Sequence, residues 1–474
     1  MKKYLIALVV ILLSGLAYYF ASPFHNIWWL MWLMPIPVLI YVYHHNFWHS
    51  LLVSFMIGLA PGIDTIIGYW STPIPIQAFL LEGLLQSLEW TIVILLTRYL
   101  TRKNQAAYSI FIYPCVLAIV EYLVSLTEQG IFNTIAYSQL SVLPILQIAS
   151  ITGFIGITFI VSLFSSCVAY SIIFYQQKIS VLIAIITTII ILAISLGFGF
   201  YHLNQQKMLN QQSVSVKVGL VSIDMAPKNI FNPENAAKIA EQYNNAVQRL
   251  ATQGAQIILL PEEILAINKN NSSEILAIFS KVAKDNHIIV IVGVNETIGE
   301  KHFNTALLFN QNGQLVGKYL KRHFVPIVED DLTPGSELVN FLINNQKAGI
   351  AICRDMDYPN PAHQYGKNNS GVLFVPAWDF SVDEKVHAMG AFLNGIQNGY
   401  TIVRSARAGL LSVTDPVGNT TEISTNLQPV TTLSTIAIIA NQTSFYARHG
   451  NWFVWLLFIV LILIFGDGLV SSKR

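Results

Sequence analysis

The sequence predicts a multi-pass α-helical membrane domain joined to a water-soluble α/β domain of layered sheets and helices. Two observations carry this prediction. Charged residues make up only 11% of the 474 residues, and the mean hydropathy is +0.53, whereas soluble proteins contain about 25% charged residues. The charges are also concentrated in one long central stretch. This composition excludes a disordered, collagen-like or coiled-coil chain, since each needs many charges or a Gly/Pro period.

The charge distribution divides the chain into three parts. Residues 1–201 hold six Lys/Arg and five Asp/Glu, residues 202–451 hold 19 and 20, and residues 452–474 hold two and one. We therefore expect a transmembrane domain over 1–201, a soluble domain over 202–451, and a final membrane helix with a short tail over 452–474. The middle part is long enough for a domain with a full core. The chain has 27 basic and 26 acidic residues, so no positive excess indicates binding to nucleic acid.

Eight apolar stretches approach the length of about 20 residues that a membrane-spanning helix needs. The first could instead be a cleaved signal peptide, since Lys2 and Lys3 precede its apolar run. The eighth is shorter than ideal. We expect seven spans before the soluble domain and one after it, at Tyr4–Phe20, Ile27–Tyr43, Trp48–Trp70, Pro75–Leu96, Tyr108–Thr127, Ile148–Phe174, Val181–Tyr201 and Trp452–Phe465.

The basic residues predict the orientation of these spans. All eight Lys/Arg outside the soluble domain fall on alternate loops, and the short loops between them contain none. Because loops rich in Lys and Arg stay in the cytoplasm, we expect both chain ends inside and the soluble domain on the outer face. The domain would then be tethered at both ends, close to the lipid surface.

Four carboxyl groups lie within the apolar stretches, at Asp64, Glu82, Glu89 and Glu121. A carboxylate is costly to bury in a membrane, so each is a candidate functional group. We prefer the alternative that they lie near span ends or pair with neighbouring helices. The histidines between residues 44 and 49 have no Cys or carboxylate beside them, and we expect neither a metal site nor a cofactor.

Strand and helix patterns alternate through the soluble domain, which favours an α/β layered architecture. Strands are expected where β-branched and apolar residues gather, and helices where apolar residues recur at helical spacing. The expected strands are Val214–Ile223, Gln256–Leu260, His287–Val294, Thr305–Phe309, Ala348–Ile352, Val372–Val375, Thr401–Arg404 and Leu410–Thr414. The expected helices are Pro233–Leu250, Glu274–Asp285 and Val382–Gly399.

Three reactive side chains stand out in this domain. Glu262 follows one expected strand, Cys353 follows another, and Lys321 lies in a basic segment between them. A carboxylate, an ammonium and a thiol suffice for acyl transfer through a thioester. The carboxylate takes the thiol proton, and the ammonium stabilises the oxyanion that develops on the attacked carbonyl.

Each of these residues has an ordinary alternative. Cys115 and Cys167 fall in apolar stretches, so Cys353 is the one thiol of the soluble domain and a disulfide within that domain is excluded. Cys353 could be a small core residue, and Lys321 a solvated lysine. Glu263 stands beside Glu262, and alternation on a strand would direct only one of the two toward the site.

The segments Pro261-Glu262, Lys321 and Ile352-Cys353 resemble the general-base, lysine and nucleophile segments of the nitrilase, or carbon–nitrogen hydrolase, superfamily. The resemblance runs through the whole soluble domain. It implies a nitrilase-like αββα sandwich with a triad formed by Glu262, Lys321 and Cys353.

The membrane plan resembles a narrower group within this superfamily. Seven spans, an outer nitrilase-like domain and one returning span are similar to the bacterial apolipoprotein N-acyltransferase family. The segment Lys321–Pro326 is close to the lysine segment of that family. The resemblance implies that residues around the triad support it or bind substrate, namely Glu329, Arg354, Asp355 and Trp378.

The sequence departs from that family after the nucleophile. The family usually has an aromatic residue and then a glutamate there, whereas Arg354 and Asp355 follow Cys353 in this chain. Asp355 could replace the glutamate, with a side chain shorter by one methylene. Asp355 and Asp357 would raise the pKa of the thiol, and Arg354 and Lys321 would oppose them.

The resemblance implies a phospholipid-dependent N-acyltransferase of the bacterial inner membrane that acts as a monomer on the periplasmic side. Cys353 would take an acyl chain from a membrane phospholipid as a thioester and pass it to the α-amine of a diacylglyceryl-cysteine lipoprotein. The altered segment after Cys353 leaves open a membrane-anchored amidase, or an acyltransferase with a different amine acceptor. A non-enzymatic transporter or sensor is the third hypothesis, because carboxyls lie in the membrane domain.

Overall fold

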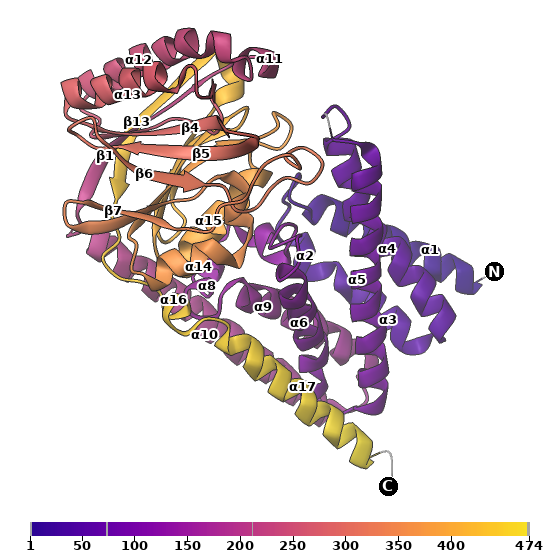
Figure 1. Cartoon of the computed structure of the whole chain (residues 1–474). Helices are drawn as coiled ribbons and strands as arrows, with labels where there is room; N and C mark the ends of the chain where they lie inside the picture. The colour runs from indigo at the N-terminus through magenta and orange to yellow at the C-terminus, as the bar shows by residue number, and fades with distance from the viewer. Residues whose placement is uncertain (1, 73, 211, 472–474) are drawn as a thin grey trace. The chain divides into compact units, whose positions relative to one another are not determined.

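The computed structural model divides the chain into two compact units (Figure 1). Residues 1–204 and 449–474 form a helical unit, and residues 205–448 form an α/β unit. These limits lie three residues from the boundaries that we expect at 201/202 and 451/452. The structure describes residues 2–72, 74–210 and 212–471.

The helical unit consists of apolar helices. Six are long and apolar enough to cross a membrane: α1 (Lys2–Ala21), α4 (Phe47–Gly68), α5 (Ile76–Lys103), the 3₁₀ turn η1 (Ala107–Phe111) with α6 (Ile112–Ser125), α9 (Phe154–Ile173) and α10 (Lys178–Asn210). Three shorter apolar stretches contain α2 (Leu30–Leu33), α3 (Pro35–His44), α7 (Leu143–Leu146), α8 (Ala149–Thr152) and most of α17 (Trp452–Ser471).

Each apolar stretch expected from the sequence is largely helical, but not every one is a single helix; Ile27–Tyr43, for example, contains both α2 and α3. The stretch Ile148–Phe174 is divided, because α8 ends at Gly153 and α9 begins at Phe154. Gly153 has a φ of 69°, a conformation that glycine adopts without a Cβ penalty and that ends helices. The number of membrane crossings and their orientation stay predictions.

The α/β unit contains two sheets. The seven-stranded sheet has the order β13-β1-β2-β4-β5-β6, with β3 beside β4, and the six-stranded sheet has the order β12-β11-β10-β9-β8-β7. The first contains β1 (Ser215–Ile223), β2 (Ile257–Leu259), β3 (Ala266–Ile267), β4 (Ile289–Ile298), β5 (Lys301–Phe309), β6 (Leu315–Leu320) and β13 (Val430–Ile438). The second contains β7 (Val339–Ile343), β8 (Gln346–Ile350), β9 (Val372–Trp378), β10 (Thr401–Arg407), β11 (Leu410–Thr414) and β12 (Thr420–Ser424).

Helices cover the outer faces of both sheets (Figure 1). Buried residues of the two longest helices of this unit pack against the first sheet, and further helices lie on the other side of the sandwich. The helices are α11 (Pro227–Ile230), α12 (Ala236–Thr252), α13 (Ser272–Asn286), α14 (Pro359–Lys367), α15 (Val386–Asn398) and α16 (Phe445–His449). The expected nitrilase-like αββα sandwich is therefore confirmed, together with the expected helical membrane domain.

The main core lies between the two sheets. Fully buried side chains from both of them form one cluster, which includes Leu220, Leu259, Ile350 and Phe374. In the middle of each sheet, β1, β2 and β4 are parallel to one another, as are β8, β9 and β10. The carboxyl ends of parallel strands meet at one edge of a sheet, and the polar side chains that follow these strands gather there.

Every strand and helix expected in this domain is present, but several further elements are not predicted. They are the strands β3, β6, β7, β12 and β13 and the short helices α11, α14 and α16. These strands are short or lie at sheet edges; β12, for example, is exposed over most of its length. Edge strands with exposed polar residues lack the apolar alternation by which a strand is recognised in a sequence.

We predict that Leu220→Ala lowers the free energy of unfolding of the α/β unit by about 2–5 kcal/mol, because Leu220 is fully buried between the sheets. Leu342→Ala is the matched control, since Leu342 is 63% exposed and its loss should cost less than about 1 kcal/mol. Pulse proteolysis of the full chain across a urea series measures both. Equal losses in the two variants would contradict this placement of the core.

Candidate active site

Two of the predicted reactive residues meet at the end of β9. The backbone N–H of Glu262, in the segment after β2, donates to the carbonyl of Ala377 at 3.3 Å. The thiol of Cys353 lies 3.8 Å from the carbonyl oxygen of Trp378, to which it donates. Glu262 follows a strand of the first sheet and Cys353 a strand of the second, so the two sheets each bring one residue to the same strand end.

A glycine in β4 allows this approach. A Cβ atom on Gly293 would lie 2.7 Å from the Cα of Glu262 and would also collide with the carbonyl of Pro261. Any side chain at position 293 would therefore push the Glu262 segment away from the sheet. The sequence places this glycine in an expected strand, but only the fold shows that it allows the Glu262 segment to pack against the strand.

Lys321 lies between two carboxylates. Its Nζ donates to Oε1 of Glu262 at 2.7 Å and to both oxygens of Glu329 at 2.8 Å. Asn304 of β5 donates to Oε1 of both glutamates, at 2.6 and 3.2 Å. Lys321 is 2% exposed, Glu262 3% and Glu329 7%. The structure thus brings together the predicted lysine, the predicted base and Glu329 in one buried ion cluster.

The charges of this cluster determine its proton affinities. Burial alone lowers the pKa of Lys321, but Glu262 and Glu329 more than offset this effect, and the pKa is raised well above its usual value. Burial raises the pKa of Glu262; Lys321 opposes the rise and Glu329 adds to it. The arrangement therefore holds a firmly protonated ammonium next to a carboxyl group that binds a proton more readily than an exposed one.

Cys353 begins the 3₁₀ turn η4 (Cys353–Asp357) directly after β8. Its φ of 43° is a left-handed conformation that non-glycine residues seldom adopt. Burial raises the pKa of its thiol well above the usual value; Glu262 adds to the rise, and Lys321 opposes it. The resting group is thus a neutral thiol, which reacts as a nucleophile when a base takes its proton during the attack.

Asp355 contacts the segments that carry Lys321 and Cys353, but it is not among the charges that act most strongly on the thiol. Its carboxylate accepts hydrogen bonds from the Tyr319 hydroxyl at 2.8 Å, from the Ile352 backbone N–H at 3.1 Å and from the His323 backbone N–H at 2.9 Å. It therefore joins the lysine segment to the segment that carries Cys353. After Glu262 and Lys321, the charges that act most strongly on the thiol are Asp379 and Arg404, not Asp355, Asp357 and Arg354 as the sequence suggested.

The other two predicted supporting residues lie around the same strand end. Arg354 follows Cys353, and its guanidinium lies beside the ring of Tyr358, 5.9 Å from the centroid. The indole of Trp378 lies under the guanidinium of Arg407 at 3.8 Å and stacks with Phe231. These contacts keep a large aromatic surface next to the carbonyl that the thiol approaches.

The choice between Glu262 and Glu263 depends on their partners. Both are buried, so burial does not separate them. Glu263 has a φ of 44° and accepts a hydrogen bond from Asn295 at 2.7 Å. Burial, with the Glu262 charge as the next cause, raises the pKa of Glu263 to about 8. Glu262 is the one of the two that contacts Lys321.

The sequence analysis missed several polar residues near Cys353. Arg404 of β10 forms a two-pronged, fully buried ion pair with Asp379. His387 lies 2.5 Å from Asp383; burial opposes its protonation, but Asp383 raises its pKa to about 9. The one sequence signal for these residues was that Asp379 directly follows Trp378, a residue already predicted to lie at the site. Asn304 lies one residue before an expected strand, and no sequence signal indicated its role.

The described residues do not include a group of three or more His, Cys, Asp or Glu side chains placed to hold a metal ion. The side chains around Cys353 are instead a thiol, a carboxyl that shares its hydrogen-bond donors with a second carboxylate, and an ammonium. Such a set can deprotonate a thiol and stabilise negative charge on an attacked carbonyl oxygen.

Two family models match the chain, and they match different units. The carbon–nitrogen hydrolase model matches residues 217–438, and the model of the apolipoprotein N-acyltransferase N-terminal domain matches residues 14–167. The first range covers most of the α/β unit, and the second lies entirely within the helical unit.

Relatives that align along most of the chain are apolipoprotein N-acyltransferases. The chain is 22% identical to an apolipoprotein N-acyltransferase of Geobacter metallireducens over 96% of this chain and 93% of the relative. It is 23% identical to one of Haemophilus ducreyi over 78% and 77%. An amidase from Nesterenkonia sp. matches half of the chain and 96% of its own length, with 16% identity and a TM-score of 0.41. With both unit models matched in order, this chain is similar along most of its length to the apolipoprotein N-acyltransferases, and its α/β unit is similar to the carbon–nitrogen hydrolases.

Proposed function

We propose that this protein transfers an acyl chain from a membrane phospholipid to the α-amine of a diacylglyceryl-cysteine lipoprotein, through a thioester on Cys353. The observation that carries the proposal is the buried contact between Lys321 and Glu262, with both charges acting on the Cys353 thiol. The apolar helices and the similarity to apolipoprotein N-acyltransferases support a lipid donor and a lipoprotein acceptor.

In the first half-reaction, Glu262 accepts the thiol proton while the sulfur attacks the ester carbonyl of the phospholipid. Negative charge develops on the carbonyl oxygen, where the Lys321 ammonium and the backbone N–H of Arg354 stabilise it. The carbon–oxygen bond of the ester then breaks. Glu262 returns its proton to the departing alkoxide, which leaves as a lysophospholipid, and the acyl chain stays on Cys353.

In the second half-reaction, the neutral α-amine of the acceptor attacks the thioester carbonyl. Glu262 takes a proton from the attacking nitrogen, the carbon–sulfur bond breaks, and the thiolate regains a proton. The products are an amide and the free thiol. Glu329 keeps Lys321 in place through both steps, because it contacts the ammonium at 2.8 Å independently of Glu262.

The proposed location is the periplasmic face of the inner membrane. The α/β unit follows α10 and precedes α17, so its chain is joined at both ends to apolar helices. The eight Lys/Arg of the cytoplasmic loops and tail support this orientation. A site tethered in this way can take both substrates from the outer leaflet, and we propose that one chain suffices for activity.

We predict that incubating the purified protein with phospholipid, in the absence of acceptor, adds one acyl group to Cys353. Cys353→Ala should abolish the adduct, whereas the Cys115→Ala/Cys167→Ala double variant should retain it, since those thiols lie in α6 and α9. Intact-protein mass spectrometry with peptide mapping measures the adduct.

An acyl adduct that persists in Cys353→Ala would contradict the thioester mechanism. Adding a diacylglyceryl peptide to the acylated enzyme tests the acceptor. Discharge of the thioester onto the peptide amine supports the proposal. Discharge onto a different amine, or ammonia release from small amides, would support the alternative acceptor or the amidase raised by the segment after Cys353.

Glu262→Gln should slow formation of the acyl-enzyme by about 10²-fold or more, because general-base catalysis typically contributes 10²–10⁴-fold. Glu263→Gln removes a neighbouring carboxyl that contacts Asn295 instead of Lys321, and it should change the rate by less than about tenfold. Single-turnover kinetics with a labelled phospholipid compares the two variants. A larger loss in Glu263→Gln would assign the base to that residue.

The rate of acyl-enzyme formation should fall as the pH drops through the pKa of Glu262, because the base must be deprotonated to act. Burial and the Glu329 charge raise this pKa above that of an ordinary carboxyl group. Glu329→Gln removes the neighbouring charge and should move the acidic limb to lower pH, by on the order of one unit. Glu296→Gln, which removes a carboxylate paired with Lys318, is the control and should leave the limb in place. An acidic limb that stays in place or moves to higher pH would contradict the conclusion that Glu329 raises the pKa of the base.

A further inference from the structure

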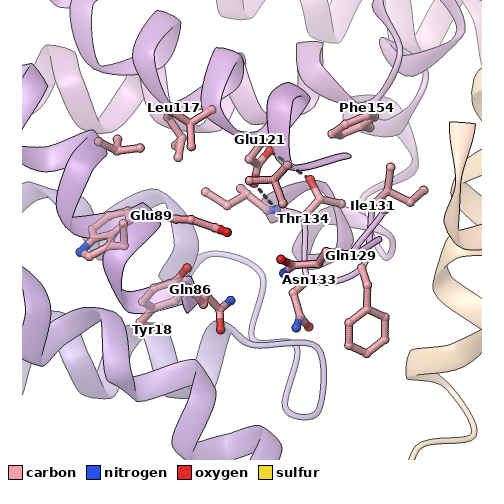
Figure 2. Close-up of a pocket in the computed structure, with 17 residues that line it drawn as sticks. Tyr18, Gln86, Glu89, Leu117, Glu121, Gln129, Ile131, Asn133, Thr134 and Phe154 are labelled. Atoms are coloured by element: carbon pink, nitrogen blue, oxygen red, sulfur yellow. Dashed lines mark hydrogen bonds between the residues drawn. The ribbon is translucent and has the colours of Figure 1, made fainter. Parts of the chain in front are cut away.

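A cavity with both apolar and polar lining residues lies within the helical unit, between α1, α5 and α6, beside the segment 129–135 (Figure 2). Its volume is about 60 Å³, which leaves room for a few water molecules or for one small polar group. Carboxylates, amides, a phenol and aromatic rings line it, and no Lys, Arg or His is among its lining residues. The cavity is therefore suited to a ligand group that donates hydrogen bonds and carries positive charge.

One carboxylate in this cavity differs from the other acidic groups of the apolar stretches. Three of the four are partnered, as the sequence analysis preferred: Asp64 by His25 and Ser22, Glu82 by Asn133, and Glu121 by Thr134, Thr158 and the backbone N–H of Ile135. Glu89 has no hydrogen-bond or ion-pair partner among the residues that the structure describes. The negative charge of Glu89 is therefore available to pair with a group from outside the chain.

The position of Glu89 makes that compensation important. It lies near the middle of α5, about 20 Å from either end at 1.5 Å per residue. An ionised carboxylate within the membrane is costly unless a cation or several donors accompany it. The cavity supplies room beside Glu89 for such a group, as Figure 2 shows.

Tyr18 gives a second, independent indication of a ligand. It is 8% exposed, yet in the described part of the chain its hydroxyl has no hydrogen-bond partner. Figure 2 shows this hydroxyl directed toward Glu89. Gln86 lies three residues before Glu89, on the same face of α5, and lines the same cavity. A carboxylate, a phenol oxygen and an amide oxygen thus surround one space, and each can accept a hydrogen bond.

Helix packing keeps this polar face of α5 toward the cavity. A Cβ atom on Gly62 of α4 would lie 2.6 Å from the Cα of Gly83, and one on Gly58 would lie 2.8 Å from the Cα of Ser87. The small residues let α4 and α5 approach closely. The face that carries Gly83 and Ser87 is therefore occupied by α4, and the neighbouring face with Gln86 and Glu89 is left for the cavity.

We propose that this cavity binds the primary ammonium group of an amphiphile. The ammonium pairs with Glu89 and donates to Tyr18 and Gln86, while the ring of Trp90, 5.5 Å from that of Tyr18, offers a cation–π surface. Carboxylates repel anionic groups, which disfavours a phosphate in the same space. The ammonium can belong to a lipid headgroup or to the free N-terminal amine of a lipopeptide. This inference stands independently of the reaction at Cys353.

The test measures binding with the reaction removed, in the full-length Cys353→Ala protein. Native mass spectrometry compares retention of a phospholipid with an ethanolamine head against one with the same chains and a glycerol head. A second pair compares a diacylglyceryl peptide having a free α-amine with its N-acetylated form. We expect at least about a tenfold preference for the ammonium-bearing member of one pair, as for a charged hydrogen bond.

Variants assign the preference to the cavity. Glu89→Gln should abolish it, and Tyr18→Phe should reduce it by about two- to tenfold. Asp467→Asn, which removes a carboxylate of α17 bonded to Tyr108 and outside the cavity, should retain it. A preference within the lipid pair assigns the ammonium to the headgroup, and one within the peptide pair assigns it to the α-amine. Equal retention within both pairs, or a preference that survives both Glu89→Gln and Tyr18→Phe, would overturn the proposal and leave a cavity that holds water.

Discussion

The α/β unit depends on one buried ammonium held between two buried carboxylates. Removing the ammonium would leave two carboxylates uncompensated in the interior, and breaking a buried ion pair in this way costs about 3–5 kcal/mol. Lys321, Glu262 and Glu329 therefore act as one cluster, and their contributions to the stability of the fold are not independent of one another. Burial raises the proton affinity of Glu262, and the surplus negative charge that two carboxylates and one ammonium leave adds to the rise. Without Glu329, the ammonium would lower the pKa of Glu262 further, and the carboxylate would accept a thiol proton less readily.

The sandwich supplies this cluster and the thiol from opposite sides. Glu262, Asn304 and Lys321 lie on or directly after strands of the first sheet, and Cys353 follows a strand of the second. The geometry of the site is thus set by how the two sheets pack on each other. Asp355 strengthens the connection, because its carboxylate bonds both to the backbone before Cys353 and to the residues around Lys321. The packing of the core between the sheets therefore also fixes the positions of the side chains in the site at its edge.

The sequence predicts features that depend on a local pattern of residues, and it does not predict features that depend on contacts between distant segments. The alternating strands and helices, and the strand ends that carry Glu262 and Cys353, are local patterns, and they were predicted; the αββα arrangement was implied by the resemblance. The preference for Glu262 over Glu263 also came from the resemblance, because a positive φ at Glu263 breaks the strand alternation that would otherwise separate the two residues. Asn304, Arg404 and the direction of the Asp355 carboxylate depend on contacts between segments far apart in the chain. No spacing within one segment indicates such contacts.

The same principle of charge compensation applies in both units. Near Cys353, Lys321 has its two glutamates, Arg404 has Asp379, and His387 has Asp383. Three of the four carboxyls in the apolar stretches of the helical unit also have partners within the chain, where the surroundings are still less able to stabilise an isolated charge. Glu89 is the one of these four without a hydrogen-bond or ion-pair partner among the described residues, and it lines the cavity. An ammonium group bound there, as proposed, would give Glu89 the compensation that the other three carboxyls find within the chain.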